Sequence, residues 1–318
     1  MEHEYYMKRC LQLAENGRQN AKPNPMVGAV IVAQNRIIGE GYHVRFGEGH
    51  AEVNAFASVK PEDEMLLNEA TIYVSLEPCS HYGKTPPCAD LIISKGIKRC
   101  VCGCVDPFAK VQGRGIQRMR DAGIEVIVGV MEKECLALNR RFITFNAKHR
   151  PYILLKWAQT LNGFISRKGG PLQLSTPKTQ MLVHQLRAEN DAILVGHTTF
   201  LTDHPRLDVR QWSGQNPERI VLSPTMSAQN ARPSNWTVAA TIDEVIAHLY
   251  ATKKQSLVVE GGRMTLQAFI DRGLWDEIRI EIAPVLITDG VPAPHIPSDA
   301  HIEKTESIDG NQIITLCR

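Results

Sequence analysis

The stretch from Gly49 to Cys88 restricts the possible folds of this chain most, because three of its side chains form a ligand set for one metal ion. These side chains are His50, Cys79 and Cys88. One imidazole and two thiolates supply three zinc ligands and leave the fourth tetrahedral position for water, as in catalytic rather than structural zinc sites. The fold must therefore bring residues that are far apart in the sequence to a single point.

Glu52 adds a second feature of a catalytic site. It follows His50 in the order His-Ala-Glu, where a carboxylate can take a proton from a zinc-bound water and return it to a leaving amine. A His-x-Glu piece followed by Pro-Cys is typical of zinc-dependent deaminases, in which the glutamate is not a ligand. The alternatives are a structural zinc site, or scattered cysteines that bind no metal. Both leave Glu52 without a purpose, and a structural site normally has four ligands close together.

The segment between the two cysteines is longer than in the general deaminase pattern, which closes with Cys-x-x-Cys. Here Ser80 to Pro87 separate the two cysteines. This loop contains His81 and Lys84, which are suited to hydrogen bonding or to holding an anion. We therefore expect the loop to carry side chains into the pocket beside the metal.

Composition and length favour a two-domain globular protein. The chain has 318 residues, of which 43% are hydrophobic and 22% charged, and it is long enough for two domains with separate cores. Its formal net charge of +2 does not indicate a nucleic-acid partner. The sequence shows no secretory signal and no membrane span, so we expect a cytoplasmic protein with reduced cysteines. Cys100, Cys102 and Cys104 alternate in an apolar run, and we expect them to pack on one face of a strand.

The first half alternates between strand and helix patterns. This order implies a largely parallel sheet covered by helices, with ligands at the carboxyl ends of the strands. His50 and Glu52 fall at the amino-terminal end of a helix, where the partial positive charge favours an ionised glutamate. We predict helices over 4–16, 51–57, 88–95, 115–122 and 132–145, and strands over 26–32, 36–43, 71–76, 99–105 and 124–128.

Asn24 and His43 are further candidates in this half. Asn24 lies between two prolines, which restrict its backbone, and its amide can pair with the donor and acceptor edges of a heterocycle. A simple turn residue is an equally good interpretation of Asn24. His43 lies at the far end of the second predicted strand.

The pattern changes near residue 147, where a basic, proline-ended segment begins, and we place the domain boundary there. The strand that follows carries Lys156, whose charge needs a partner such as an anionic substrate. Later, Gly261 and Gly262 join a strand to a helix, a junction at which backbone amides can approach a pyrophosphate. Two glycines after a strand are more often just a turn. No G-x-G-x-x-G run supports a Rossmann domain. We predict helices over 177–189 and after 196, and strands over 151–158, 191–195, 219–222, 236–239 and 256–260.

The motifs of both halves together resemble one family. The first half resembles the deaminase half of the bifunctional riboflavin-biosynthesis deaminase–reductases, within the cytidine-deaminase-like superfamily; it does so in Pro23-Asn24-Pro25-x-Val27-Gly28, in His50-Ala51-Glu52 and in Glu77-Pro78-Cys79-x-His81-x-Gly83-x-Thr85-Pro86-Pro87-Cys88. The second half resembles the reductase half, in Lys156-x-Ala158-x-Thr160-Leu161-x-Gly163, in Arg187-Ala188-x-x-Asp191, in Asp203-x-Pro205-x-Leu207-x-x-Arg210 and in Glu260-Gly261-Gly262. The long loop between the cysteines is that family's own form.

This resemblance implies an α/β fold in two parts: a cytidine-deaminase-like three-layer α/β/α domain over residues 1–146, and a dihydrofolate-reductase-like α/β domain over residues 147–318. It implies Zn²⁺ in the first and NADPH in the second. By the same resemblance, Glu52 and Lys156 are catalytic. Asn24, His43, His81, Lys84, Arg187, Leu207, Arg210 and Glu260 bind substrate; Ala158, Thr199, Asp203, Ser223, Gly261 and Gly262 contact NADPH.

The implied reaction begins with deamination of 2,5-diamino-6-(ribosylamino)-4(3H)-pyrimidinone 5′-phosphate, and NADPH then reduces the ribosyl chain to ribityl. The expected partner is this small phosphorylated pyrimidine, with neither nucleic acid nor membrane, and copies of the chain are expected to associate through the reductase half. Two alternatives remain. Asn162 stands where an aspartate is usual, and the segment 169–175 lacks the usual tryptophan, so the tail can instead be a structural or dimerising module behind a deaminase. The second alternative is a nucleoside or tRNA deaminase. The near-neutral net charge and the long loop between the cysteines disfavour it.

Overall fold

The computed structural model describes residues 2–82, 86–106, 112–168, 170, 172–228 and 234–318. The chain divides into two compact units, which we call the N-terminal unit (Met1–Lys148) and the C-terminal unit (His149–Arg318). The last helix before the division continues to Lys148 rather than ending near residue 145. Within the described residues, none of the helices combines the length and the apolar character that crossing a membrane requires.

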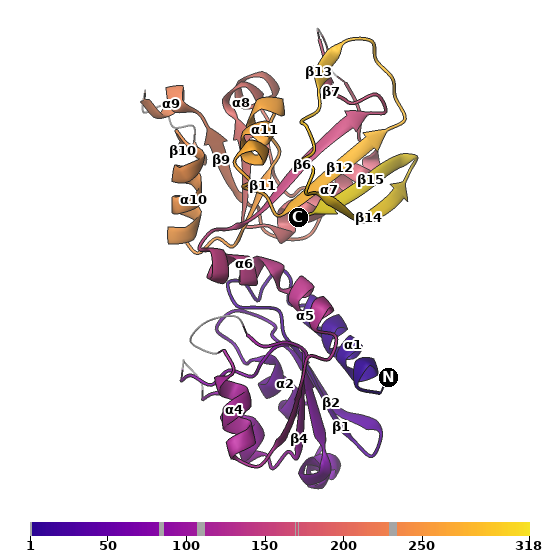
Figure 1. Cartoon of the computed structure of the whole chain (residues 1–318), viewed down its shortest axis with the longest axis vertical. Helices are drawn as coiled ribbons and strands as arrows, with labels where there is room; N and C mark the ends of the chain where they lie inside the picture. Colours follow the sequence, from indigo (N-terminus) through magenta and orange to yellow (C-terminus); the bar gives the residue numbers. More distant parts are fainter. Residues whose placement is uncertain (1, 83–85, 107–111, 169, 171, 229–233) are drawn as a thin grey trace. The chain divides into compact units, whose positions relative to one another are not determined.

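The N-terminal unit is a three-layer α/β/α structure built on a five-stranded sheet of order β2-β1-β3-β4-β5 (Figure 1). The elements are α1 (Glu2–Glu15), β1 (Gly28–Ala33), β2 (Arg36–Tyr42), α2 (Ala51–Ala57), the 3₁₀ helix η1 (Pro61–Glu69), β3 (Thr71–Val74), α3 (Cys88–Ser94), β4 (Arg99–Cys102), α4 (Arg114–Asp121), β5 (Glu125–Val128), α5 (Glu132–Leu138) and α6 (Arg140–Lys148).

Alternating side chains of the strands build a core on each face of this sheet. On one face, Ile31 and Ile72 pack with residues of α2, α3 and α4 such as Phe56. On the other face, Val30 packs with residues of α1 and α5, among them Met7. The central strands β1 and β3 are therefore buried on both sides, which explains their continuous apolar sequences.

The sheet is mixed, so the expectation of a largely parallel sheet is wrong for its first part. Strand β1 pairs antiparallel with both β2 and β3, while β3, β4 and β5 are parallel. The expected helix over 132–145 is interrupted at Asn139, whose buried side chain both accepts from and donates to the backbone of Met26, at 2.8 Å in each case. Cys100 and Cys104 do not share a face: β4 ends at Cys102, and Cys104 packs in the opposite core.

The C-terminal unit has an eight-stranded sheet of order β10-β9-β8-β11-β6-β12-β15-β14, together with a separate two-stranded pair β13-β7. Its first six strands are parallel, and β15 and β14 are antiparallel additions at the edge. The elements are β6 (Tyr152–Thr160), β7 (Phe164–Arg167), α7 (Pro177–Glu189), β8 (Ala192–Gly196), α8 (His197–Asp203), β9 (Glu218–Leu222), α9 (Pro224–Ala228), β10 (Thr237–Ala239), α10 (Ile242–Ala251), β11 (Ser256–Val259), α11 (Arg263–Asp271), β12 (Glu277–Ala283), β13 (Gly290–Pro292), β14 (His301–Ile308) and β15 (Asn311–Cys317).

Helices cover both faces of this second sheet. The α10 and α11 helices pack residues such as Val245 and Phe269 against Leu155 and Leu257 on one face. The α7 helix packs Leu186 against the opposite face. The predicted helix over 177–189 is confirmed to the residue by α7, which begins with a capping box at Thr176 and a proline at its first turn.

Candidate zinc centre and cofactor cavity

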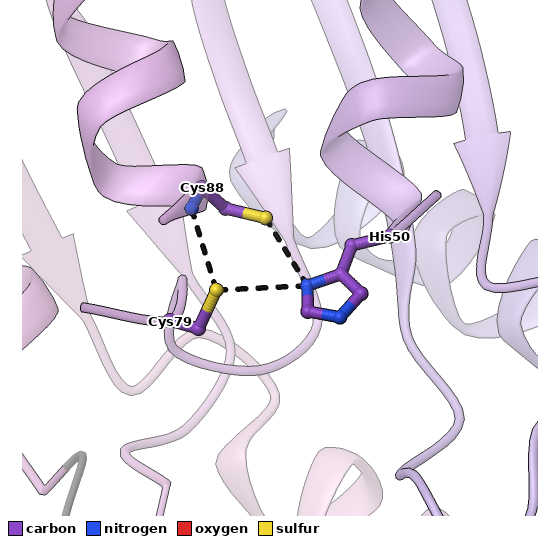
Figure 2. Close-up of side chains that lie close together, drawn as sticks. All are labelled: His50, Cys79 and Cys88. Atoms are coloured by element: carbon purple, nitrogen blue, oxygen red, sulfur yellow. Dashed lines mark hydrogen bonds between the residues drawn. The ribbon is translucent and has the colours of Figure 1, made fainter. Parts of the chain in front are cut away.

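The three predicted zinc ligands converge in the N-terminal unit. His50 is the N-cap residue of α2, Cys88 is the first residue of α3, and Cys79 lies in the loop after β3. Their ligand atoms lie within 4.8 Å of one another, and Figure 2 shows all three side chains pointing toward one space. The His50 Nδ1 lies 3.3 Å from the Cys88 Sγ and 3.5 Å from the Cys79 Sγ.

This geometry fits zinc. In a tetrahedral site, Zn–S bonds of about 2.3 Å and Zn–N bonds of about 2.0–2.1 Å place the nitrogen and sulfur atoms about 3.5 Å apart, close to both observed separations. The donor set has no fourth protein ligand among the described residues. The backbone N–H of Cys88 donates to the Cys79 Sγ at 3.3 Å, a bond that stabilises the thiolate form which a metal requires.

Glu52 is held beside the ligands in the first turn of α2 and is almost completely buried. Burial, and then the neighbouring Cys79 sulfur, raise the pKa of the Glu52 carboxyl to about 7. A carboxyl that titrates near neutrality is suited to both taking up and giving back a proton. The arrangement therefore combines an open metal position with a group that can move protons.

Glu77 is a buried residue of the Glu-Pro-Cys motif to which sequence reasoning gave no role. Its two carboxylate oxygens accept four backbone N–H groups, one from the segment after β4 and three from the amino-terminal end of α4. These donors are Asp106 (3.2 Å), Gly113 (2.9 Å), Gly115 (2.9 Å) and Ile116 (3.4 Å). Glu77 thus fixes the loop that carries Cys79 to the amino-terminal end of α4. The only sign of this role in the sequence is that the charged Glu77 directly follows a strand of buried apolar residues.

Asn24 and His43 form a hydrogen-bonded pair next to the zinc ligands. The His43 Nδ1 lies 3.1 Å from the Gly49 carbonyl, which can only accept, so Nδ1 carries the proton. Burial lowers the pKa of His43, and the neutral ring then accepts at Nε2 from the Asn24 amide, 3.1 Å away. This leaves the side-chain carbonyl of Asn24 without a hydrogen-bond partner among the described residues. The His43 and His50 rings are in edge contact, with centroids 5.3 Å apart.

The loop residues are less closely tied to this centre. His81 is exposed, and no contact joins it to the zinc ligands. Lys84 lies outside the described residues. Their expected roles in holding substrate remain predictions.

The C-terminal unit contains a large cavity of about 1100 Å³. Typical small-molecule pockets are about 300–1,000 Å³, so this one has room for a dinucleotide and a second ligand. It is lined by nine of the predicted residues: Lys156, Ala158, Arg187, Thr199, Asp203, Arg210, Glu260, Gly261 and Gly262. The structure therefore brings most of the predicted substrate and cofactor residues to one place.

The cavity contains a nearly buried ion pair. Arg187 donates from Nη2 to a carboxylate oxygen of Glu260 at 2.8 Å. Burial alone raises the pKa of Glu260, but the charges of Arg187 and Lys156 outweigh it and hold that pKa below its usual value. The second oxygen of Glu260 is buried without a hydrogen-bond donor from the described residues. This oxygen has almost no accessible surface, so a substrate hydroxyl reaches it only if the cavity wall shifts.

One face of α7 lines the cavity through Gln180, His184 and Arg187, at the spacing of successive helical turns. Sequence reasoning missed His184. It is buried, and its Nδ1 accepts from the backbone N–H of Arg210 at 3.3 Å. Arg187 also donates to the carbonyl of Asp208, at 3.4 Å. These contacts hold the segment that carries Arg210 at the edge of the cavity.

Two glycines permit close packing at the cavity floor. A Cβ on Gly196 would lie 2.2 Å from the Thr265 Oγ1, and one on Gly261 would lie 2.7 Å from the Thr265 Cβ. Thr265 belongs to α11, so this helix begins directly against the ends of β8 and β11. The close approach brings the first turn of α11 to the cavity.

Leu207 and Ser223 are not placed where their expected roles suggest. Leu207 is buried in the core with Leu154 and Leu186 and is not a lining residue of the cavity. Ser223 is completely buried behind the cavity wall, hydrogen-bonded to His197. Sequence reasoning could not separate a residue in the wall from one behind it.

Asn162 has a structural role. Its side chain accepts from the Thr160 hydroxyl at 2.9 Å and donates to the Ile287 carbonyl at 2.7 Å. An aspartate cannot make the second bond, because its ionised carboxylate has no proton to donate. Asn162 therefore stabilises the turn between β6 and β7, and it is not among the lining residues of the cavity.

Comparison with known proteins identifies the family. Residues 1–104 match the model of the cytidine and deoxycytidylate deaminase zinc-binding region, and residues 151–307 match that of the RibD C-terminal domain. The riboflavin biosynthesis protein RibD of Aquifex aeolicus is 38% identical over 317 residues, covering 90% of this chain and 88% of the relative. The chain belongs to the RibD family. The Escherichia coli RibD is 36% identical over 331 residues, covering 90% of this chain and 89% of the relative.

Solved structures agree with this family. A diaminohydroxyphosphoribosylaminopyrimidine deaminase/5-amino-6-(5-phosphoribosylamino)uracil reductase from Thermotoga maritima is 35% identical, with a TM-score of 0.90 over 99% of this chain and 98% of the other. A structure of RibD from Acinetobacter baumannii is 28% identical, with a TM-score of 0.84 over the same shares. The expected fold class, a deaminase-like unit followed by a RibD-type reductase unit, is confirmed.

Proposed function

We propose that this protein is a bifunctional enzyme of riboflavin biosynthesis that first deaminates a phosphorylated diaminopyrimidine and then reduces its ribosyl chain. The convergence of His50, Cys79 and Cys88 beside the buried Glu52 carries the first part of this proposal. The cavity lined by Lys156 and Glu260 supports the second part. Both lie in a chain whose relatives in the same family span nearly its whole length.

In the deaminase reaction, His50, Cys79 and Cys88 would hold Zn²⁺, which lowers the pKa of a bound water toward neutrality. Glu52, buried beside these ligands, would take a proton from the attacking water as the water oxygen adds to the pyrimidine carbon that carries the amine. Glu52 then returns the proton to the nitrogen, which leaves as ammonia. Asn24, held by His43, presents its carbonyl to the heterocycle.

In the reductase reaction, NADPH would supply the hydride to the ribosyl carbon. The Lys156 ammonium forms no hydrogen bond or ion pair with the described part of the chain, so it can face substrate. There the ammonium would give a proton to the ring oxygen whose bond to that carbon breaks as the hydride adds. Glu260 is fixed by Arg187 in the wall of the same cavity. Arg187 and Arg210 supply positive charge for the substrate phosphate.

Two substitutions test these roles separately. Glu52→Gln should abolish ammonia release while zinc content and reduction of the deaminated intermediate stay at the wild-type level. Lys156→Ala should abolish NADPH oxidation with that intermediate and leave ammonia release unchanged, and the exposed Lys178→Ala serves as its control. Unchanged deamination in Glu52→Gln, loss of zinc in that variant, or normal reduction in Lys156→Ala contradicts the assigned roles.

A nucleoside or tRNA deaminase is tested by the same ammonia assay with cytidine and with adenosine-containing RNA, neither of which should be turned over. The finding that Asn162 stabilises a turn removes one of the two sequence departures that favoured a deaminase with an inactive tail. Association of copies through the C-terminal unit and a cytoplasmic location remain predictions.

A further inference from the structure

His197 is a lining residue of the C-terminal cavity that the sequence motifs do not single out. It is the first residue of α8 and lines the cavity together with Thr198 and Thr199. Its Nδ1 lies 2.7 Å from the hydroxyl oxygen of Ser223. No other described residue forms a hydrogen bond with this imidazole.

Ser223 determines which ring nitrogen of His197 carries a proton toward the cavity. The Ser223 hydroxyl is fully buried and already accepts from the backbone N–H of Met226 at 3.1 Å. Its single proton therefore needs an acceptor, and the Nδ1 of the neutral imidazole is the one within reach. The remaining proton of the neutral ring is then on Nε2.

The other protonation states support the same conclusion. In the imidazolium, both ring nitrogens carry protons, so Nε2 is again a donor. The neutral tautomer with its proton on Nδ1 would leave the buried Ser223 proton without an acceptor, which is costly. The Nε2 of His197 is thus a hydrogen-bond donor in the neutral ring, because Ser223 occupies Nδ1, and in the imidazolium, because both nitrogens carry protons.

The surroundings of His197 are suited to an anion. Thr198 and Thr199 contribute hydroxyls, and the first turn of α11, capped by Gly262, contributes backbone amides to the same cavity. Gly262 and Thr199 are in close contact, since a Cβ on the glycine would lie 3.3 Å from the Thr199 Oγ1. The starts of α8 and α11 therefore lie in contact, and Figure 1 shows the two helices next to each other. Donors grouped in this way are typical of phosphate sites.

We propose that His197 donates a hydrogen bond from Nε2 to a phosphate group of NADPH, and that Ser223 is a positioning residue that acts through His197. This inference rests on the proposed NADPH-dependent reduction and assigns the cofactor contact to a different side chain. The phosphate is either the pyrophosphate, which NADH shares, or the 2′-phosphate, which NADH lacks. Comparison of the two cofactors separates these sources.

The first test measures dissociation constants by NADPH and NADH fluorescence with the full-length, zinc-loaded protein and no substrate. His197→Leu should weaken NADPH binding about tenfold, which corresponds to ~1.4 kcal/mol. His197→Gln, which keeps an N–H donor at similar reach, should lose less than about threefold. His301→Leu, an exposed position on β14, should change nothing. If His197→Leu weakens NADH binding as much as NADPH binding, the contact is to the pyrophosphate. If it weakens NADPH binding alone, the contact is to the 2′-phosphate. Unchanged binding of both in His197→Leu overturns the proposal.

The second test is a double-mutant cycle. Ser223→Ala should weaken NADPH binding several-fold in the wild-type background and have no further effect in His197→Leu, because the serine acts through the histidine. Equal losses in the two backgrounds mean that Ser223 contacts the cofactor itself, and they overturn the positioning role. Circular dichroism identifies any variant that fails to fold; in that case Ser223→Cys, which keeps a weak donor, replaces it. If the wild-type protein binds neither cofactor, the proposed reductase function fails instead.

Discussion

Replacing Glu77 by glutamine is the strongest test of how the loop after β3, which carries the zinc ligand Cys79, is held in place. The carboxylate of Glu77 accepts four backbone N–H groups, two at each oxygen. An amide of the same shape keeps one oxygen and points an NH₂ group at the other two donors. Each buried N–H group left without an acceptor costs about 1–3 kcal/mol. Glu77→Gln should therefore destabilise the N-terminal unit by roughly 3 kcal/mol.

The loop after β3 carries Cys79, so the same substitution should also loosen zinc. We expect the zinc of Glu77→Gln to be released to a chelator at a lower chelator concentration than that of the wild-type protein. Stability is measured by urea unfolding followed by far-ultraviolet circular dichroism with zinc in excess. Tryptophan fluorescence is an internal control, because Trp157, Trp212, Trp236 and Trp275 all belong to the C-terminal unit; its transition should not move.

Glu125→Gln is the matched control in the same unit. Glu125 forms an ion pair with Arg99 on the exposed surface, and such pairs contribute about 0–1 kcal/mol. The account of Glu77 is refuted if the two glutamine variants unfold alike and retain zinc equally well.

Two further predictions concern the C-terminal unit. Arg187→Met should destabilise it by about 3–5 kcal/mol near neutral pH, because a buried carboxylate loses its partner. The ionised Glu260 of the wild type contributes stability that is lost as the pH falls through its lowered pKa. In Arg187→Met that pKa rises, so the deficit should shrink on acidification; a pH-independent deficit in fluorescence-monitored unfolding argues against this. Gly196→Ala should cost about 1–3 kcal/mol by overpacking. Adding Thr265→Ala should restore the stability of the Gly196→Ala variant, because it removes the Oγ1 atom that the new methyl group would meet. It should not restore the stability of Gly261→Ala, where the close atom is the Cβ that alanine keeps. Restored stability in both variants, or in neither, contradicts this packing.

The zinc centre could be predicted from the sequence because its chemistry is carried by residue types and their order. Few kinds of site combine a histidine, two cysteines and a glutamate. The elements that position these residues also have local sequence signals: an apolar strand before Cys79 and helices that begin at His50 and Cys88. The antiparallel pairing of β1 with β3 could not be predicted in this way. Strand order depends on long-range contacts, which local periodicity does not encode.

The cavity of the C-terminal unit shows where sequence reasoning ends. Motifs located Lys156, Arg187 and Glu260, all of which line it. The motifs could not show that the Ser223 side chain is buried behind the cavity lining while His197 is part of that lining. Both residues follow the end of a strand, and only the direction of the side chain separates the two cases. The pairing of Glu77 with amides 29 to 39 residues away also could not be predicted, since those donors are backbone groups common to all residues.

A single coupled assay tests the central claim most directly. Purified protein with zinc, NADPH and the diaminopyrimidine ribosylamine phosphate is followed simultaneously for ammonia and for NADPH absorbance. The account predicts that ammonia release comes first and that NADPH is then consumed in an equal amount. In Glu52→Gln both signals should be absent, and adding the deaminated intermediate should restore NADPH consumption without ammonia release. Oxidation of NADPH without ammonia release, or ammonia release with no oxidation at any time, contradicts it.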